Sequence, residues 1–363
     1  MPQIAGFRGA IAGGARDAGR AVYRYHQLFA GPGGRQLVRK MVVCAVRLAP
    51  WQDAEVRPHE LVEPAARDAE LARIRETRGH AAPVLAGFRD PAGETDRLFR
   101  KAEGLAATHE VTTPDGTVHR LWRVNDAELL GKLRHLFAPK PLHVLDGHAR
   151  YEAMLAYQGE LAGKHALALY SAANYGLACL VELTDPALVV AARHRVIRGA
   201  GVQSAAVLAA AREHFVVETL AGAAGDVTAQ RAALAAIVAH QPAFVVVFAG
   251  EPDAYKLTLK PEVSPIAAGL NVHRAVQKSE PIVVDQLFVA RHLAGGTVAT
   301  EVDASAALAA KGDVALIMRP VSVEEIVRIA DAGQHLPAGS TAFHPPLAPG
   351  LIAMPIEPDE DVV

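Results

Sequence analysis

The pattern of hydrophobic and polar positions in the first third of the chain is typical of strands joined by tight turns. Strand-like segments cover residues 19–29 and 40–50, and the turn AGPGGR between them predicts a hairpin. A second hairpin is predicted over residues 108–124, where Pro-Asp-Gly supplies the turn. Between the hairpins, the charged segment 63–79 predicts a surface helix and residues 82–88 predict a strand.

The remainder of the chain mixes helix and strand patterns without an internal repeat. Helices are expected over residues 126–137, 149–161, 227–240, 283–293 and 324–333, and the segment 201–215 opens a more alanine-rich second half. Strands are expected over residues 142–146, 174–183, 243–250, 254–260 and 313–322. Paired hairpins together with this mixed order favour an α+β fold over a doubly wound parallel sheet.

Length and composition indicate an ordinary globular chain. Its 363 residues correspond to two domains at roughly 150 residues each, and we expect lobes at 1–200 and 201–363. The chain is 51% hydrophobic and 21% charged, which excludes a disordered or fibrous protein. Its two cysteines exclude a disulfide scaffold. Residues 232–250 lack acidic and basic side chains, but His-Gln-Pro interrupts them, so a helix and a strand are expected rather than a membrane span.

Charge is nearly balanced overall and uneven locally. A net charge of −2 argues against a protein that coats nucleic acid or anionic membrane. Residues 1–40 carry seven basic side chains against the single acid Asp17, a local charge of +6. No apolar h-region follows, so we expect a cytoplasmic protein rather than a secreted one. An organellar presequence remains an alternative, and a basic lobe facing an anionic ligand is the preferred interpretation.

The most informative segment is LHVLDGHARYEAMLAY, where a strand changes into a helix at Asp146. Gly147 allows a tight turn, and the first amides of the following helix point at the space beside it. His148 and Arg150 add a proton-transfer group and a planar cation, so the segment could hold a phosphate. Alternatively, Asp146 is only a helix cap and Arg150 a solvated charge.

Five segments in the same order resemble one family. The Asp146 box is similar to the D-G-H-H-R-Y box of the bacterial and archaeal family called domain of unknown function ten-fifteen. RPHELVEP, DGTVHRLW and RHRVI resemble further boxes of that family, and LPAGSTAFHPPLAPGL resembles its C-terminal motif. The resemblance covers roughly residue 20 to the end and implies a ParB/sulfiredoxin-like mixed-sheet core with a second α/β lobe that closes the site.

The chain also departs from the family pattern. Ala149 replaces the second histidine of the central box, Gly339 and Pro346 stand where the family has lysines, and Arg193 replaces a threonine. A P-P-Y-D motif expected near the N-terminus is missing. Losing one group that stabilises transition-state charge commonly lowers a rate about 100-fold or more, so these changes leave it open whether activity is kept or redirected.

The resemblance implies phosphoryl transfer to a small molecule, most simply a kinase of free serine or a related hydroxy amino acid. Pyrophosphate or a nucleotide would be the donor, with Mg²⁺ held by Glu60 or Asp146. The expected catalytic residues are His59, Glu60, Asp146 and His148. The expected phosphate-binding residues are Gly147, Ala149, Arg150, His194, Arg195, Ser340 and Thr341.

Other classes of function stay open. Without turnover, the protein could bind a phosphorylated metabolite as a regulator, or it could be a biosynthetic enzyme that acts on a phosphorylated intermediate. No P-loop, Rossmann fingerprint, G-x-S-x-G box or zinc-ligand spacing occurs. We expect a small-molecule substrate and no nucleic-acid or membrane partner, and a homodimer is left open.

Overall fold

The computed structural model describes residues 4–362, which divide into two compact units. The first unit runs to Val189 and includes the chain from Phe343 onward, and the second is Val190–Ala342. This division differs from the expected boundary at residue 200. The C-terminal segment belongs to the first unit because β20 (Ile352–Pro355) pairs with β2 (Ala10–Ile11) and β6 (Gly79–His80), an arrangement that local patterns do not show.

The first unit contains a nine-stranded mixed sheet in the part of the chain that the structure describes. Its order is β5-β10-β7-β11-β4-β3-β9-β8, with β1 paired to β4. The strands are β1 (Ile4–Ala5), β3 (Val22–Ala30), β4 (Gln36–Arg47), β5 (Val56–Arg57), β7 (Val84–Phe88), β8 (His109–Thr112), β9 (Val118–Val124), β10 (Leu142–Asp146) and β11 (Tyr175–Glu182). Both predicted hairpins are confirmed, since β3 pairs antiparallel with β4 and β8 with β9. The pairs β5–β10 and β7–β11 are parallel, which makes the sheet mixed.

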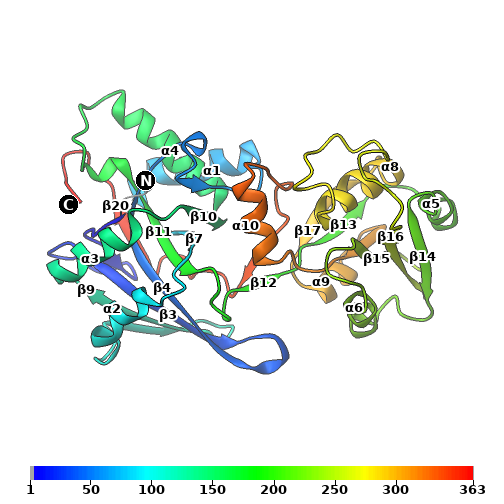
Figure 1. The fold of residues 1–363 in the computed structure, drawn as a ribbon, viewed down its shortest axis with the longest axis horizontal. Coiled ribbons are helices and arrows are strands. Elements are labelled where there is room, and N and C mark those ends of the chain that lie inside the picture. The colour runs from blue at the N-terminus through cyan, green and yellow to red at the C-terminus, as the bar shows by residue number, and fades with distance from the viewer. Residues whose placement is uncertain (1–3, 363) are drawn as a thin grey trace. The chain divides into compact units, whose positions relative to one another are not determined.

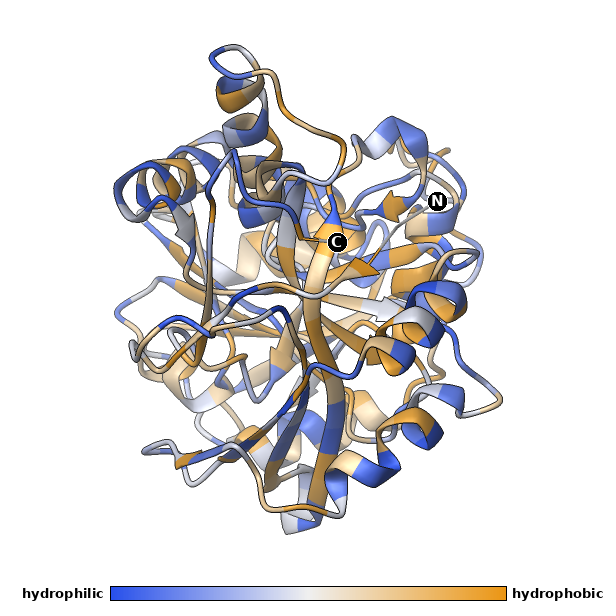
Figure 2. Ribbon diagram, turned by 90° about the vertical axis from the view of Figure 1, so that its left-hand side faces the viewer, coloured by the Kyte–Doolittle hydropathy of each residue, from blue (hydrophilic) through white to orange (hydrophobic). Residues whose placement is uncertain are grey.

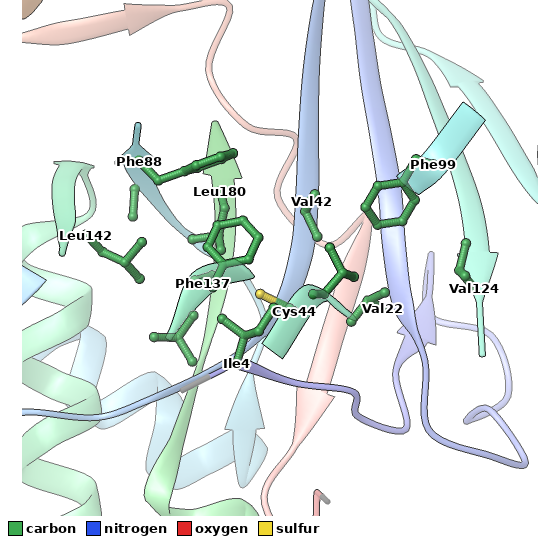
Figure 3. Packing of buried hydrophobic residues seen from close by; sticks show 14 residues of the cluster. Ile4, Val22, Val42, Cys44, Phe88, Phe99, Val124, Phe137, Leu142 and Leu180 are labelled. Carbon is green, nitrogen blue, oxygen red and sulfur yellow. The ribbon is translucent and has the colours of Figure 1, made fainter. Parts of the chain in front are cut away.

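Four helices pack on this sheet (Figure 1). They are α1 (Pro64–Thr77), α2 (Glu94–Glu103), α3 (Ala127–Phe137) and α4 (His148–Ala162). Phe99 of α2 and Phe137 of α3 pack with Val42, Phe88 and Leu180 of the strands (Figure 3). A second cluster joins α1 and α4 to β7 and β10. Burial of these side chains supplies the main favourable term for folding this unit.

The second unit is built on a six-stranded sheet of order β14-β16-β15-β18-β13-β17, whose pairs are antiparallel. Its strands are β13 (His194–Arg198), β14 (Phe215–Leu220), β15 (Ala243–Phe248), β16 (Ala254–Leu259), β17 (Thr297–Glu301) and β18 (Val314–Ile317). Its helices are α5 (Ser204–Ala211), α6 (Val227–Ala235), α7 (Glu280–Ile282), the π-helix η4 (Val283–Val289), α8 (Ala290–His292), α9 (Ala304–Ala309) and α10 (Val323–Asp331). The antiparallel sheet together with these helices makes this unit α+β. The helix expected at 283–293 is not α-helical over its whole length, because Val283–Val289 form a π-helix and only Ala290–His292 form an α-helix.

Hydropathy follows the layers of both units. The strands carry mostly apolar colour, while the helices carry both colours (Figure 2). The segment 232–250 divides between α6 and β15, as predicted. Within residues 4–362, no helix is both long and apolar enough to cross a membrane.

Several basic residues near the N-terminus form ion pairs with protein carboxylates. Arg16 pairs with Glu357 and Glu360 near the C-terminus. Arg24 is buried and pairs with acidic residues of α2. Part of the local positive charge is therefore neutralised by protein carboxylates.

Candidate functional site

The predicted strand-to-helix turn is present at the end of β10. Gly147 has φ +91° and ψ 30°, and α4 begins at the next residue, His148, without a side-chain cap. The first amides of an α-helix have no intrahelical acceptor and favour an anion. The turn therefore supplies the backbone geometry of a phosphate site.

Glycine is required in this turn for two reasons. A positive φ near +91° is unfavourable for residues with a Cβ. In addition, a Cβ at position 147 would lie 3.0 Å from Nη1 of Arg150 and 3.5 Å from Cα of Val84. A side chain here would thus contact β7 and require the arginine to shift by a few tenths of an ångström.

His59 and His148 are in contact next to this turn. The parallel pairing of β5 with β10 brings His59 alongside Val144. The main-chain N–H of His59 donates to Nε2 of His148 over 3.3 Å, and the two rings are edge to face with centroids 4.6 Å apart. His59 is completely buried, so its ring belongs to the inner wall of the site.

Two carboxylates lie at this end of the sheet in different environments. Glu60 is 8% exposed, and its Oε1 is 3.5 Å from Nε2 of His59. Asp146, the last residue of β10, is exposed. The first unit therefore brings together seven predicted residues: His59, Glu60, Asp146, Gly147, His148, Ala149 and Arg150.

Arg150 does not present a free guanidinium fork at this turn. Its Nη1 donates to the carbonyl oxygen of Pro83 over 2.6 Å, and its Nη2 is 3.7 Å from Oε1 of Glu70 on α1. The side chain thus connects α4 to the segment before β7 and to α1. Glu70 is a partner that sequence patterns did not single out, because only the packing of α1 on α4 brings it there.

The other four predicted residues lie in the second unit. On β13, Nδ1 of His194 accepts a hydrogen bond from the Met318 amide over 3.0 Å. Burial lowers the pKa of His194 to about 4, so the ring is neutral at pH 7. This buried, neutral ring provides no positive charge for phosphate.

Arg195 is 1% exposed and its guanidinium is held by protein groups. Nε and Nη2 donate to the two carboxylate oxygens of Asp285, each over 3.0 Å. Nη1 donates to the carbonyl oxygens of Arg193 and Gly339 over 3.1 and 3.2 Å. Asp285 lies on the π-helix η4, a rare form that occurs often at functional sites. Arg195 therefore joins β13, the π-helix and the segment before Ser340.

Ser340 and Thr341 follow Gly339, which has φ +69°. The Ser340 hydroxyl donates to the carbonyl oxygen of Pro337 over 2.6 Å, and the Thr341 carbonyl oxygen accepts from Nε of Arg193 over 3.2 Å. Both residues are buried. Arg193, just before β13, and Arg195 on β13 thus hold this segment by its carbonyl groups.

Arg39 is a buried cation near Asp146 that sequence reasoning included only among the basic N-terminal residues. It is 0% exposed and donates to Oε1 of Gln27 and to the carbonyl oxygen of Pro345. Burial lowers the pKa of Arg39, while the nearby charges of Asp185 and Asp146 act in the opposite direction. The alternation of side chains along β4 could have indicated that Arg39 points inward. It could not have indicated that Gln27 and Pro345 are its partners.

No group of three or more histidine, cysteine, aspartate or glutamate side chains that could hold a metal ion occurs within residues 4–362. Mg²⁺ does not need such a cage, because it is commonly held by one or two carboxylates together with substrate phosphates. The carboxylates of Glu60 and Asp146 fit that mode of binding.

Together these features define an α+β protein of two units, in which a strand–glycine–helix turn lies beside a buried histidine–glutamate pair. The chain belongs to the family DUF1015, described as protein of unknown function, whose model matches residues 14–287. The resemblance inferred from the sequence is thereby confirmed. No curated protein matches the chain.

Several solved structures are similar to this one at low identity. A conserved hypothetical protein from Pyrococcus furiosus is 11% identical with a TM-score of 0.41, covering 84% of this chain and 93% of that chain. SbnI with C-terminal truncation from Staphylococcus aureus is 15% identical with a TM-score of 0.44, covering 88% and 91%. A free serine kinase in complex with AMP is 12% identical with a TM-score of 0.40, covering 84% and 89%.

Proposed function

We propose that the protein is a small-molecule phosphotransferase, most simply a kinase of free serine or a related hydroxy amino acid. One observation carries the proposal: the helix start that can hold a phosphate lies beside a shielded carboxylate that can accept a proton. The link between them is His59, which contacts both His148 and Glu60. The motif resemblance supplies the substrate class, and we further propose a ParB/sulfiredoxin-like fold for the first unit.

Phosphoryl transfer depends mainly on positioning the reactants and neutralising charge. In the proposed reaction, the amides of Gly147 to Ala149 bind the donor phosphate. Glu60 takes the proton of the acceptor hydroxyl, and the hydroxyl oxygen forms a bond to the phosphorus that is transferred. At the same time, the bond between that phosphorus and the bridging oxygen of the donor breaks. With pyrophosphate as donor, the products are the phosphorylated hydroxy amino acid and orthophosphate.

Other side chains of the first unit would support this step. The His148 ring lies at the start of α4, where it can donate a hydrogen bond to the transferring group. Asp146 is exposed at the end of β10 and can meet a cation that accompanies the donor. Mg²⁺, when bound to Glu60 or Asp146, would neutralise charge on the donor phosphates.

Product analysis tests the proposal. Protein is incubated with serine, Mg²⁺ and, separately, pyrophosphate, ATP or ADP, and phosphoserine is measured by mass spectrometry. We expect product with at least one donor and a loss of about 100-fold or more in Glu60→Gln, since general bases contribute on that order. Glu63→Gln is the matched control, because Glu63 is an exposed side chain of the same segment. Absence of phosphoserine with every donor would refute the proposal.

A second candidate function is binding of a phosphorylated metabolite without turnover. It is favoured by the engagement of Arg150 and Arg195 with protein oxygens, which leaves fewer cations for transition-state charge. Calorimetry with phosphoserine, pyrophosphate and nucleotides tests it. Binding without product would support a regulator, and absence of heat with every ligand would reject it.

A further inference from the structure

His59 is the one predicted catalytic residue that is completely enclosed by protein. The exposed fraction of His59 is 0%. A side chain that exchanges a proton with the substrate has to contact the substrate, and a fully buried ring does not. Its contacts nevertheless extend to three parts of the candidate site. This combination of burial and contacts suggests that the side chain acts through its neighbours.

The first contact fixes the ring of His59 itself. Nδ1 lies 2.8 Å from the carbonyl oxygen of Val144. A carbonyl oxygen only accepts, so Nδ1 carries a hydrogen and donates it. This bond attaches the imidazole to β10, two residues before Asp146, and turns Nε2 toward the opposite side.

The second contact is with the proposed base. Nε2 of His59 is 3.5 Å from Oε1 of Glu60, a contact that attracts the carboxylate when Nε2 as well as Nδ1 carries a hydrogen. Because the ring is held by β10, it limits the positions that the Glu60 carboxylate can take. A general base has to lie within hydrogen-bond reach of the proton it removes, so its position affects the rate directly.

The third contact sets the tautomer of His148. Its Nε2 accepts the main-chain N–H of His59 over 3.3 Å, so that nitrogen carries no hydrogen and the neutral ring carries one on Nδ1. The edge-to-face contact of the two rings, at 75° between their planes, restricts the ring's orientation as well. The neutral His148 ring therefore has its hydrogen-bond donor at Nδ1.

We propose that His59 is a positioning residue that holds the Glu60 carboxylate and the His148 imidazole in place without touching the substrate. Its effect on turnover rests on the proposed function. The structural part of the proposal does not depend on that function. It consists of the fixed tautomer of His148 and the fixed environment of Glu60.

The kinetic test uses two substitutions that separate the contacts. His59→Asn keeps a donor close to the Nδ1 position for Val144 but removes the atom that faces Glu60. We expect kcat for phosphoserine formation to fall about 100-fold, as for a misplaced reacting group, with KM for pyrophosphate unchanged. His59→Gln places an amide near the Nε2 position and should recover part of the loss. An unchanged kcat in His59→Asn would overturn the proposal.

A matched control comes from another buried histidine of the same unit. His119 on β9 contacts the Tyr25 hydroxyl at 2.6 Å and the Thr113 hydroxyl at 3.1 Å, and it has no part in the proposed site. His119→Asn should lower stability and leave kcat of the folded protein unchanged. An equal loss of kcat in this variant would assign the His59 effect to general destabilisation and overturn the proposal.

Nuclear magnetic resonance tests the same inference without any enzyme activity. In the ¹⁵N-labelled parent protein, His148 should show a protonated Nδ1 and a bare Nε2. In His59→Asn, the carboxyl ¹³C resonance of Glu60 should shift while the His148 tautomer is kept. A proton on Nε2 of His148, or an unmoved Glu60 signal, would reject the positioning role. If the parent makes no phosphoserine but these signals are found, the proposed function fails and the positioning role stands.

Discussion

Replacing Gly147 with alanine should destabilise the first unit measurably. A residue with a Cβ in the left-handed region costs about 1–2 kcal/mol, and the φ of Gly147 is +91°. The new Cβ would also lie 3.0 Å from Nη1 of Arg150, so the guanidinium must shift by a few tenths of an ångström, which strains its hydrogen bond to Pro83. Weakening of that charged hydrogen bond adds about 1–2 kcal/mol. We therefore expect the free energy of unfolding to fall by about 2–4 kcal/mol.

Urea unfolding followed by tryptophan fluorescence is suited to this measurement. Both tryptophans, Trp51 and Trp122, lie in the first unit, and Trp51 stacks on Tyr151 of α4 with ring centroids 4.4 Å apart. The signal therefore reports the unit, and the helix, that carry the substitution. A decrease of about 2–4 kcal/mol corresponds to a lower urea midpoint with an unchanged slope.

Gly159→Ala in the same helix is the matched control. Gly159 has no atom near the position of an added Cβ and no positive φ, so alanine should stabilise the helix by about 0.5–1 kcal/mol. Opposite signs for the two glycines are the expected result. A change within about 0.5 kcal/mol of the parent for Gly147→Ala would contradict the reasoning, since even the backbone term alone exceeds it.

Two further predictions concern buried charge. Burial lowers the pKa of His80 to about 4, against about 6.5 in the unfolded chain. Between these two pKa values, His80 binds more protons in the unfolded chain than in the folded protein. The contribution of His80 should therefore lower the free energy of unfolding by about 2 kcal/mol from pH 7.5 to pH 5. Urea midpoints at both pH values measure the loss, and an equal loss in His80→Gln would exclude His80 as the cause. In the second unit, Asp285→Asn should lower the calorimetric unfolding temperature, because a buried Arg195 without its carboxylate costs about 3 kcal/mol. Unchanged unfolding would show that the pair contributes no stability.

Local sequence patterns were sufficient to predict those elements whose conformation is specified by residues that are neighbours in the chain. The hairpin at β3 and β4 follows from two alternating segments and a glycine-rich turn, and α3 begins where Asp126 caps it, with its carboxylate accepting from the Leu129 amide. The turn at Gly147 belongs to the same class. These features depend on backbone conformations and side chains that are neighbours in the sequence, so the residues themselves specify them.

Partners that are distant in the sequence were not predictable in the same way. The C-terminal strand β20 returns to the first unit through its pairing with β2 and β6, and no periodicity within β20 indicates that choice. Arg195 illustrates the same point in the site, because its sequence motif predicts a phosphate ligand while the fold pairs it with Asp285 on a π-helix. Which acceptor satisfies a buried cation depends on the atoms that tertiary packing brings within hydrogen-bond distance.

The sequence by itself determined the α+β class, the family and the strand–glycine–helix turn, because each of these is a property of local pattern or of motifs in order. Only the tertiary structure decided that Glu60 lies against a buried His59 and that this histidine contacts His148. It also decided that Arg150 connects α4 to Pro83 and Glu70. The reason is physical: hydrogen bonds and ion pairs act over a few ångströms, and the residues joined here are up to 89 positions apart along the chain.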